Sequence, residues 1–271
     1  MRTSRHRSRS PAVRPCAAAR PMGTAHPAGR QETTVRSTLL LLMAIGPSLA
    51  LAQPAACSAR SGAVVPTVVE LYTSEGCSSC PPADRWLSTL RGRADVLPLA
   101  FHVTYWDRLG WTDRFGDAAY TERQHRLARQ AGRAQVYTPQ VVANGQDWQR
   151  WPQLPAPGAG PAPAVTLERH GDTVRVNVAA APGSAARWAA YWAVLEDQHQ
   201  SRVNAGENNG RLLQQDHVVR LYQPVPPWAA SAGLQAVLSA GRGDPRHPRR
   251  VAFVLTEAGS PRPLQALALG C

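Results

Sequence analysis

Residues 68–84 read VVELYTSEGCSSCPPAD and hold the clearest structural signal of the chain. The run VVPTVVEL, residues 64–71, is rich in β-branched residues and predicts a buried strand. Residues 83–91 place apolar side chains at helical spacing and predict a helix. The C-x-x-C formed by Cys77 and Cys80 therefore lies between a strand and a helix.

The following segment extends this unit, because residues 96–103 (VLPLAFHV) predict a second strand. Strand, helix and strand in this order favour a parallel sheet with a right-handed crossover. A C-x-x-C in this position is typical of a thioredoxin-like redox pair. Backbone N–H groups and the helix dipole stabilise a thiolate there. We therefore expect an exposed Cys77 to attack and a more buried Cys80 to resolve the mixed disulfide.

Other residues are candidates for the same site. Pro139, after Thr138, stands where a thioredoxin fold carries a cis-proline that faces the cysteine pair. Glu70, on the strand that leads into the motif, is a candidate proton relay beneath Cys80, the alternative being a residue with a local partner. Trp106, Trp111 and Thr138 are candidates for a substrate groove, the alternative for the two tryptophans being anchors of the core.

Two further elements complete the first half. Residues 117–131 predict a helix that Asp117 caps. Residues 136–149 predict a hairpin with its turn at Asn144 and Gly145. Arginines recur along the predicted helix region and are expected to form a solvated face: Arg123, Arg126, Arg129 and Arg133.

The second half differs in pattern. Residues 152–164 are rich in proline, glycine and alanine and predict a linker or long loop. Beyond this stretch the pattern is β throughout. Strands are expected within residues 165–178, 187–196, 211–222, 250–257 and 264–269. The expected architecture is thus an α/β domain over residues 53–151, followed by an antiparallel, sandwich-like domain over residues 165–271 packed on the first.

The N-terminal segment has the features of a leader. Residues 1–36 contain eight arginines and a single acid, and so carry +7 of the chain's formal net charge of +12. An apolar run and an Ala-Leu-Ala site follow, so residues 35–52 resemble a secretory signal peptide. We expect residues 1–52 to be removed and the mature protein to begin near Gln53. This predicts a periplasmic or secreted protein without stable membrane insertion after cleavage.

Composition excludes several classes of protein. Hydrophobic residues make up 44% of the 271 residues, too many for a disordered chain and too few for a multi-span membrane protein. Since most of the excess positive charge lies in the leader, we expect no nucleic-acid partner.

Five motifs together resemble a known family. They are VVELYTSEGCSSCPPAD (68–84), FHVTYWDRLGW (101–111), TERQ (121–124), VYTPQVVANG (136–145) and GENNGRLLQQDHVVR (206–220). Over roughly residues 66–270 the chain resembles the secreted thioredoxin-like proteins known as domain of unknown function 1223 (DUF1223). The resemblance implies a thioredoxin-like domain with a β-rich extension. It implies no established substrate.

The cysteine count suggests two disulfides. Cys16 leaves with the leader, so four cysteines remain, and an oxidising compartment favours their pairing. We predict Cys77–Cys80 as the redox disulfide and Cys57–Cys271 as a structural one that ties the termini. The long loop predicts that the second disulfide stabilises the protein by about 4–5 kcal/mol.

Three functions are compatible with these residues. The first is a thiol-disulfide oxidoreductase that acts on protein thiols and disulfides of the cell envelope and needs no organic cofactor. The second is a Cu(I)-handling protein, because Cys77, Cys80 and His102 are suitable ligands for a trigonal site. The third is a binding module in which the disulfide is structural.

Overall fold

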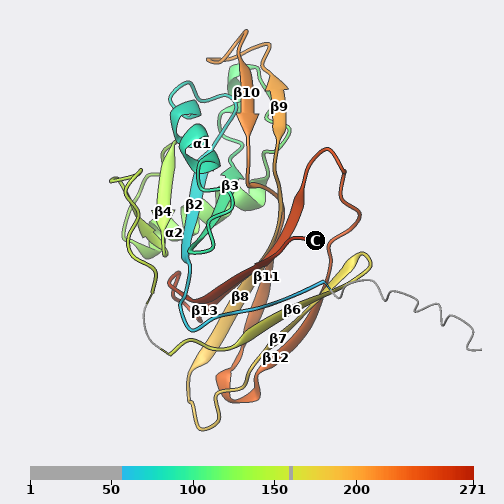
Figure 1. Cartoon of the computed structure of the whole chain (residues 1–271). Helices are drawn as coiled ribbons and strands as arrows, with labels where there is room; N and C mark the ends of the chain where they lie inside the picture. Colours follow the sequence, from blue (N-terminus) through green and yellow to red (C-terminus); the bar gives the residue numbers. More distant parts are fainter. Residues whose placement is uncertain (1–56, 159–160) are drawn as a thin grey trace, which may run out of the picture. The chain divides into compact units, whose positions relative to one another are not determined.

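The computed structural model describes residues 57–158 and 161–271 of the chain (Figure 1). The predicted leader, its signal peptide and the cleavage point near Gln53 lie outside the described residues. Within the described part, no helix has the length and apolar character needed to cross a membrane.

Strands dominate the described residues, which hold two α-helices, α1 (Pro81–Ser88) and α2 (Ala118–Gln130), and two short 3-10 helices, Asp107–Leu109 and Ala230–Ala232. The strands are β1 (Ser58–Arg60), β2 (Thr67–Thr73), β3 (Val96–His102), β4 (Gln140–Ala143), β5 (Gln146–Asp147), β6 (Val165–His170), β7 (Thr173–Val178), β8 (Arg187–Glu196), β9 (His199–Arg202), β10 (Leu212–Gln215), β11 (Val218–Ala229), β12 (Leu234–Ser239), β13 (Arg249–Glu257) and β14 (Pro263–Leu269).

The largest sheet has eight strands in the order β14-β13-β8-β11-β3-β2-β4-β5. It is mixed: β2 and β3 run parallel, β11 pairs in parallel with β3 at Val218 and Ala100, and the other neighbours are antiparallel. Strands from both halves of the sequence therefore share one sheet. Figure 1 shows this sheet curving from β4 and β2 down to β13.

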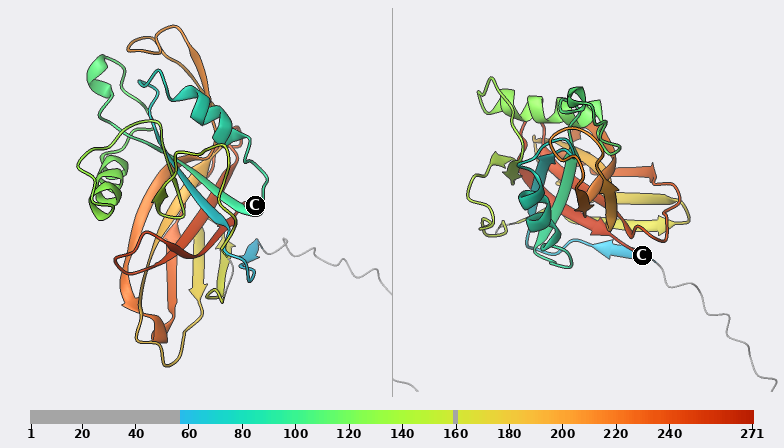
Figure 2. Two further views of the ribbon diagram at one scale, coloured as in Figure 1. Left: turned by 90° about the vertical axis from the view of Figure 1, so that its left-hand side faces the viewer. Right: turned by 90° about the horizontal axis from the view of Figure 1, so that it is seen from above.

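The two faces of this sheet are covered differently. On one face α2 packs on Tyr72 and Phe101, with Tyr120 as its buried contact. The opposite face carries Val69 and Leu71, which contact the apolar side of α1. Figure 2 shows the two helices on the two sides of the strands.

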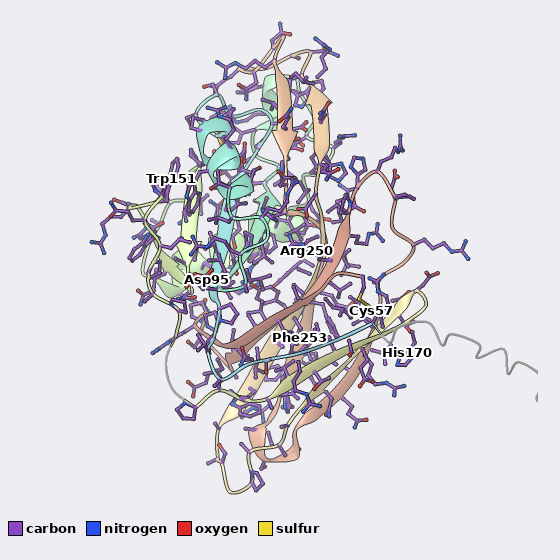
Figure 3. All side chains as sticks on the ribbon, in the orientation of Figure 1. Cys57, Asp95, Trp151, His170, Arg250 and Phe253 are labelled. Atoms are coloured by element: carbon purple, nitrogen blue, oxygen red, sulfur yellow. A yellow bond between two sulfur atoms is a disulfide. The ribbon has the colours of Figure 1, made fainter. Side chains whose placement is uncertain are left out.

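Farther along the same face as α1, a four-stranded sheet of order β1-β6-β7-β12 closes the main core. Its inward residues, among them Leu167 and Val176, pack against Trp192, Phe253 and Leu255 of the large sheet. Phe253 lies between the two sheets in Figure 3. This part of the molecule is a sheet-on-sheet layer without a helix.

The predicted fold class, an α/β thioredoxin-like domain followed by an antiparallel β-rich extension, is wrong. The described residues are mostly strand, in large mixed sheets with one α-helix on each face at one end only, and do not form a helix-flanked thioredoxin α/β fold. The physical reason is that β11, β8 and β13 continue the sheet where the prediction ended it at a domain boundary. Such pairings depend on contacts between distant residues, which local periodicity does not show.

Several local predictions are confirmed. Asp117 caps α2, with its carboxylate accepting from the N–H of Ala119 at 2.7 Å. The β4–β5 hairpin turns at Asn144 and Gly145, whose φ angles of 49° and 80° suit that pair.

Candidate functional site

The cysteine motif forms the turn between β2 and α1. Cys80 is the N-cap of α1 and Pro81 its first residue, where a missing N–H has no cost. Cys77 and Cys80 are joined as a disulfide with a Cα–Cα distance of 5.4 Å. Both cysteines are 0% exposed, whereas Ser78 and Ser79 between them are exposed. The expectation of an exposed Cys77 is therefore not met.

The motif is contacted by the loop that joins β9 to β10, residues 203–211, which we call the tip loop (Figure 1). Asn208 of the tip loop is fully buried, and its Nδ2 donates to the carbonyl oxygens of Glu75 and Cys77, each at 2.9 Å. The carboxylate of Glu207 accepts from the N–H of Ser78 at 3.0 Å and from its hydroxyl at 2.8 Å. These bonds to Ser78 hold the pKa of Glu207 below its usual value.

The tryptophans lie beside the motif. The indole N–H of Trp106 donates to the Thr138 hydroxyl at 2.8 Å, and a Cβ added to Gly76 would lie 3.0 Å from the Cβ of Trp106. The Thr138–Pro139 bond is cis. Trp111 donates to the Glu75 carboxylate at 2.8 Å. The structure thus brings both tryptophans and Thr138 to the segment that precedes Cys77.

A buried cluster of charges lies at the ends of β2 and β3. His102 Nδ1 is 2.7 Å from a carboxylate oxygen of Asp113, and the same oxygen accepts from the N–H of Glu75 at 2.8 Å. Asp84, on α1 one turn after Cys80, accepts from the hydroxyl of Thr73 at 2.8 Å. Residues 75, 84, 102 and 113 therefore surround the base of the motif, and sequence reasoning did not assign a role to Asp84 or Asp113.

Burial sets the protonation of this cluster. It raises the pKa of Glu75, and it raises the pKa of Asp84 to about 6. Burial alone would lower the pKa of His102, but the carboxylate of Asp113 raises it overall. Burial likewise opposes the charge of Asp113, yet His102 keeps its pKa below the usual value. His102 and Asp113 thus each favour the charged form of the other, and they lie next to Asp84, whose pKa is about 6.

Glu70 does not belong to the charge cluster at the base of the cysteine motif. Its carboxylate accepts from Arg123 Nε at 3.0 Å and from the hydroxyls of Tyr72 and Tyr191, each at 2.7 Å. Burial opposes its charge, but Arg123 brings its pKa below the usual value. Alternation along β2 puts Glu70 with Tyr72 on the face that α2 covers, opposite α1. Glu70 is therefore not placed beneath Cys80, and Arg123 is buried with it instead of facing solvent.

The predicted metal ligands are not arranged as a site. His102 contacts Asp113, while Cys77 and Cys80 bind each other. Within residues 57–158 and 161–271, no group of three or more histidine, cysteine, aspartate or glutamate side chains is placed to hold a metal ion.

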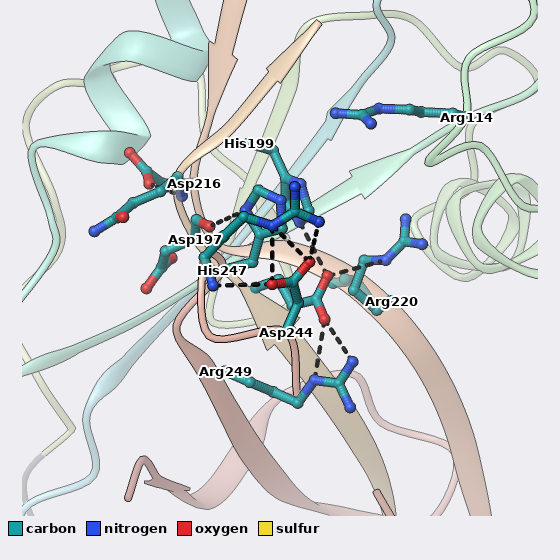
Figure 4. Close-up of polar contacts among 12 residues, drawn as sticks. Arg114, Asp197, His199, Asp216, Arg220, Asp244, His247 and Arg249 are labelled. Atoms are coloured by element: carbon teal, nitrogen blue, oxygen red, sulfur yellow. Dashed lines mark hydrogen bonds and ion pairs between the residues drawn. The ribbon is translucent and has the colours of Figure 1, made fainter. Parts of the chain in front are cut away.

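A second polar cluster fixes the base of the β9–β10 hairpin (Figure 4). Glu196, at the end of β8, accepts from Arg249 Nε at 3.0 Å and lies 3.0 Å from His199 Nε2. His199 stacks on His247 with ring centroids 3.8 Å apart. Burial lowers the pKa of His199 to about 4. The hairpin is thus anchored at its base by ion pairs and a stack of aromatic rings.

The other disulfide joins Cys57 to Cys271, 214 residues apart, with a Cα–Cα distance of 6.0 Å. Cys57 directly precedes β1, and Cys271 follows β14. Figure 3 shows Cys57 at the end of its strand, beside the smaller sheet. This bridge ties the ends of the described chain across two different sheets.

Comparisons with known proteins give a family but no activity. The family described as "Protein of unknown function (DUF1223)" matches residues 68–255. The crystal structure of protein AGR_C_4864 from Agrobacterium tumefaciens is 29% identical, with a TM-score of 0.56 over 77% of this chain and 96% of that chain. HBP35 of Porphyromonas gingivalis is 14% identical, with a TM-score of 0.48 over 77% of this chain and 76% of that chain. No curated protein matches the chain.

Proposed function

The chain belongs to the DUF1223 family, and we propose from its geometry that it is a thiol-disulfide oxidoreductase of the periplasm or of the secreted fraction. The observation that carries the proposal is the Cys77–Cys80 disulfide at the first turn of α1. At that position the helix dipole favours a thiolate once the disulfide opens. The neighbouring acid Asp84 titrates near neutral pH, as groups at functional sites often do.

The proposed reaction is disulfide exchange with protein thiols of the cell envelope. A substrate thiolate attacks the sulfur of Cys77, the Cys77–Cys80 bond breaks, and Cys80 leaves as a thiolate. A second substrate thiolate then attacks the mixed disulfide, which forms the substrate disulfide and releases Cys77. The substrate loses two electrons and the cysteine pair gains them. A second protein disulfide takes these electrons and restores the pair, and every step also runs in reverse.

One observation favours a second candidate function. Cys77 and Cys80 are both fully buried, as expected for a disulfide that only stabilises the turn. In that case the protein would be a binding module without turnover. The copper hypothesis has no comparable support, because His102 is engaged by Asp113.

The reduction potential of the Cys77–Cys80 pair separates the two candidates. The whole chain is equilibrated with glutathione or dithiothreitol, alkylated and cleaved with trypsin. Arg60 and Arg85 are successive arginines, and the sequence has no lysine, so residues 61–85 form one peptide that contains this pair alone. A potential between about −270 and −120 mV supports an exchange protein. A potential below about −300 mV contradicts it and favours the binding module.

A further inference from the structure

The tip loop is attached to the cysteine motif mainly through two of its side chains. Of residues 203–211, only Val203 and Asn208 are fully buried, while Glu207 and Asn209 are exposed. The Glu196 cluster fixes the base of the β9–β10 hairpin. The tip loop, at the other end of the hairpin, is attached less firmly. Its attachment to the motif consists mainly of the bonds made by Asn208 and Glu207.

Two glycines set the backbone conformation of the tip loop at this contact. Gly206 and Gly210 have φ angles of 69° and 81°, in the left-handed region that favours glycine. They bracket the three residues that carry Asn208 inward. Gly206 also lies against Trp111, since an added Cβ would be 3.5 Å from the Cβ of that tryptophan. The tip loop thus spans the cysteine motif and the neighbouring tryptophan segment.

A disulfide exchanges only when a thiolate reaches one of its sulfurs in line with the bond. Cys77 is 0% exposed beneath this contact, so in the closed arrangement no thiol can reach it. We infer that the tip loop is a gate over the cysteine pair, and that its opening selects polypeptide thiols as substrates. This inference rests on the proposed function.

The selection follows from the groups that the gate covers. When Asn208 withdraws, the carbonyl oxygen of Glu75 loses the amide donor, and that of Cys77 keeps only the N–H of Cys80 at 3.2 Å. When Glu207 withdraws, the N–H of Ser78 loses its acceptor. These are main-chain groups, and a polypeptide backbone supplies both the N–H donors and the carbonyl acceptor that they need. A small thiol has no backbone to replace these bonds together, so water takes the place of Asn208 and Glu207.

The test measures second-order rates of reduction of Cys77–Cys80 in the whole chain by dithiothreitol and by a synthetic cysteine pentapeptide. Alkylation and the tryptic peptide of residues 61–85 report the reduced fraction. We expect Asn208→Ala to react with dithiothreitol about tenfold faster, because two hydrogen bonds no longer oppose opening. Its rate with the pentapeptide rises less, because the pentapeptide already replaces those bonds in the unaltered protein.

One variant acts as a control and another as a second test. Asn209→Ala changes an exposed residue of the same type in the same loop, and its rates should equal those of the unaltered protein. Glu207→Ala removes an exposed side chain, so it should fold, and it should accelerate the reaction with dithiothreitol by about threefold. If Asn208→Ala does not fold, Glu207→Ala provides the test. In each folded variant the equilibrium between oxidised and reduced pair should stay unchanged, whereas a general loosening of the site would shift it.

A different result overturns each of the three claims: the gate, the selection of polypeptides and the oxidoreductase. Unchanged rates with dithiothreitol in folded Asn208→Ala and Glu207→Ala overturn the gate. Equal acceleration with dithiothreitol and with the pentapeptide overturns the selection of polypeptides. A reduction potential below about −300 mV overturns the oxidoreductase, whatever the ratio of these rates.

Discussion

The two disulfides of this protein differ in exposure, and the difference is the opposite of what is usually expected, namely that the reactive disulfide is the more exposed one. The pair proposed to react, Cys77–Cys80, is fully buried beneath the tip loop. The pair expected to be structural ends at Cys271, which is exposed. Accessibility in the closed structure therefore does not tell which disulfide exchanges electrons with a partner.

What distinguishes them is the length of chain that each closes and the charges around it. Cys57–Cys271 closes a loop with a sequence separation of 214, whereas Cys77–Cys80 spans 3. A long loop removes much entropy from the unfolded chain, and a short loop removes little. Near Cys80, moreover, Asp84 is held where burial opposes its charge. The region of Cys57–Cys271 therefore stabilises the fold, while the region of Cys77–Cys80 contains Asp84, whose buried charge destabilises it.

The largest expected effect is on stability when the terminal disulfide is removed. Chain entropy predicts a loss of about 5 kcal/mol for Cys57→Ala/Cys271→Ala, and about 2 kcal/mol for the loop closed by Cys77–Cys80. Urea unfolding of this variant and of Cys77→Ala/Cys80→Ala measures both losses. Exchange with dithiothreitol at Cys77–Cys80 should persist in the first variant. A smaller loss for the terminal pair than for the internal pair would contradict the comparison.

The second test changes the charge beside Cys80 and predicts a gain in stability. Asp84→Asn keeps an oxygen that can accept from Thr73 but removes the carboxylate. The folded pKa of Asp84 is about 6 and its usual value is 3.8, so between these pH values the folded state binds more protons than the unfolded state. Stability attributable to Asp84 therefore falls as pH rises through this window.

We accordingly expect Asp84→Asn to raise the free energy of unfolding by on the order of 2 kcal/mol at pH 7.5, and to change it little at pH 3.5. Urea unfolding of both proteins at pH 3.5, 5 and 7.5 measures the difference between them. Taking the difference cancels the groups that do not interact with Asp84, including His199, whose lowered pKa of about 4 makes stability fall with decreasing pH. A difference that is the same at all three pH values would show that the Asp84 carboxylate carries no such penalty.

Local sequence signals predicted local structure well. β8 runs from Arg187 to Glu196, the predicted bounds, because its aromatic residues Trp188, Tyr191 and Trp192 already indicate a strand. The cysteine pair was found in the same way, from a strand and a helix on either side of it. What failed was the fold class, because the pairing of β11 with β3 joins residues of the two halves, and no periodicity reports that contact.

In the candidate site, too, local features are predictable from the sequence and long-range contacts are not. Alternation along β2 placed Glu70 with Tyr72, but only the structure shows that α1 lies on the other face, so the local-partner alternative for Glu70 is the one that holds. The role of Asn208 was not predictable. Its partners are carbonyl oxygens 133 and 131 residues away, and a polar GENNGR run is compatible with any exposed turn.

The smallest expected effect concerns the hydrogen bond from Trp106 to Thr138, which links the segment beside Cys77 to the loop of Pro139. Thr138→Val removes this bond and keeps the shape of the side chain, and Trp106→Phe removes it together with one ring of the indole. Thr138→Val should cost about 1 kcal/mol in urea unfolding, as a single hydrogen bond does, and Trp106→Phe should cost more because packing is also lost. In the double variant the bond is already lost, so the costs should not add, and the coupling energy should be about 1 kcal/mol. Additive costs would mean that Trp106 is held by packing alone, and that the Pro139 loop and the cysteine segment are independent neighbours.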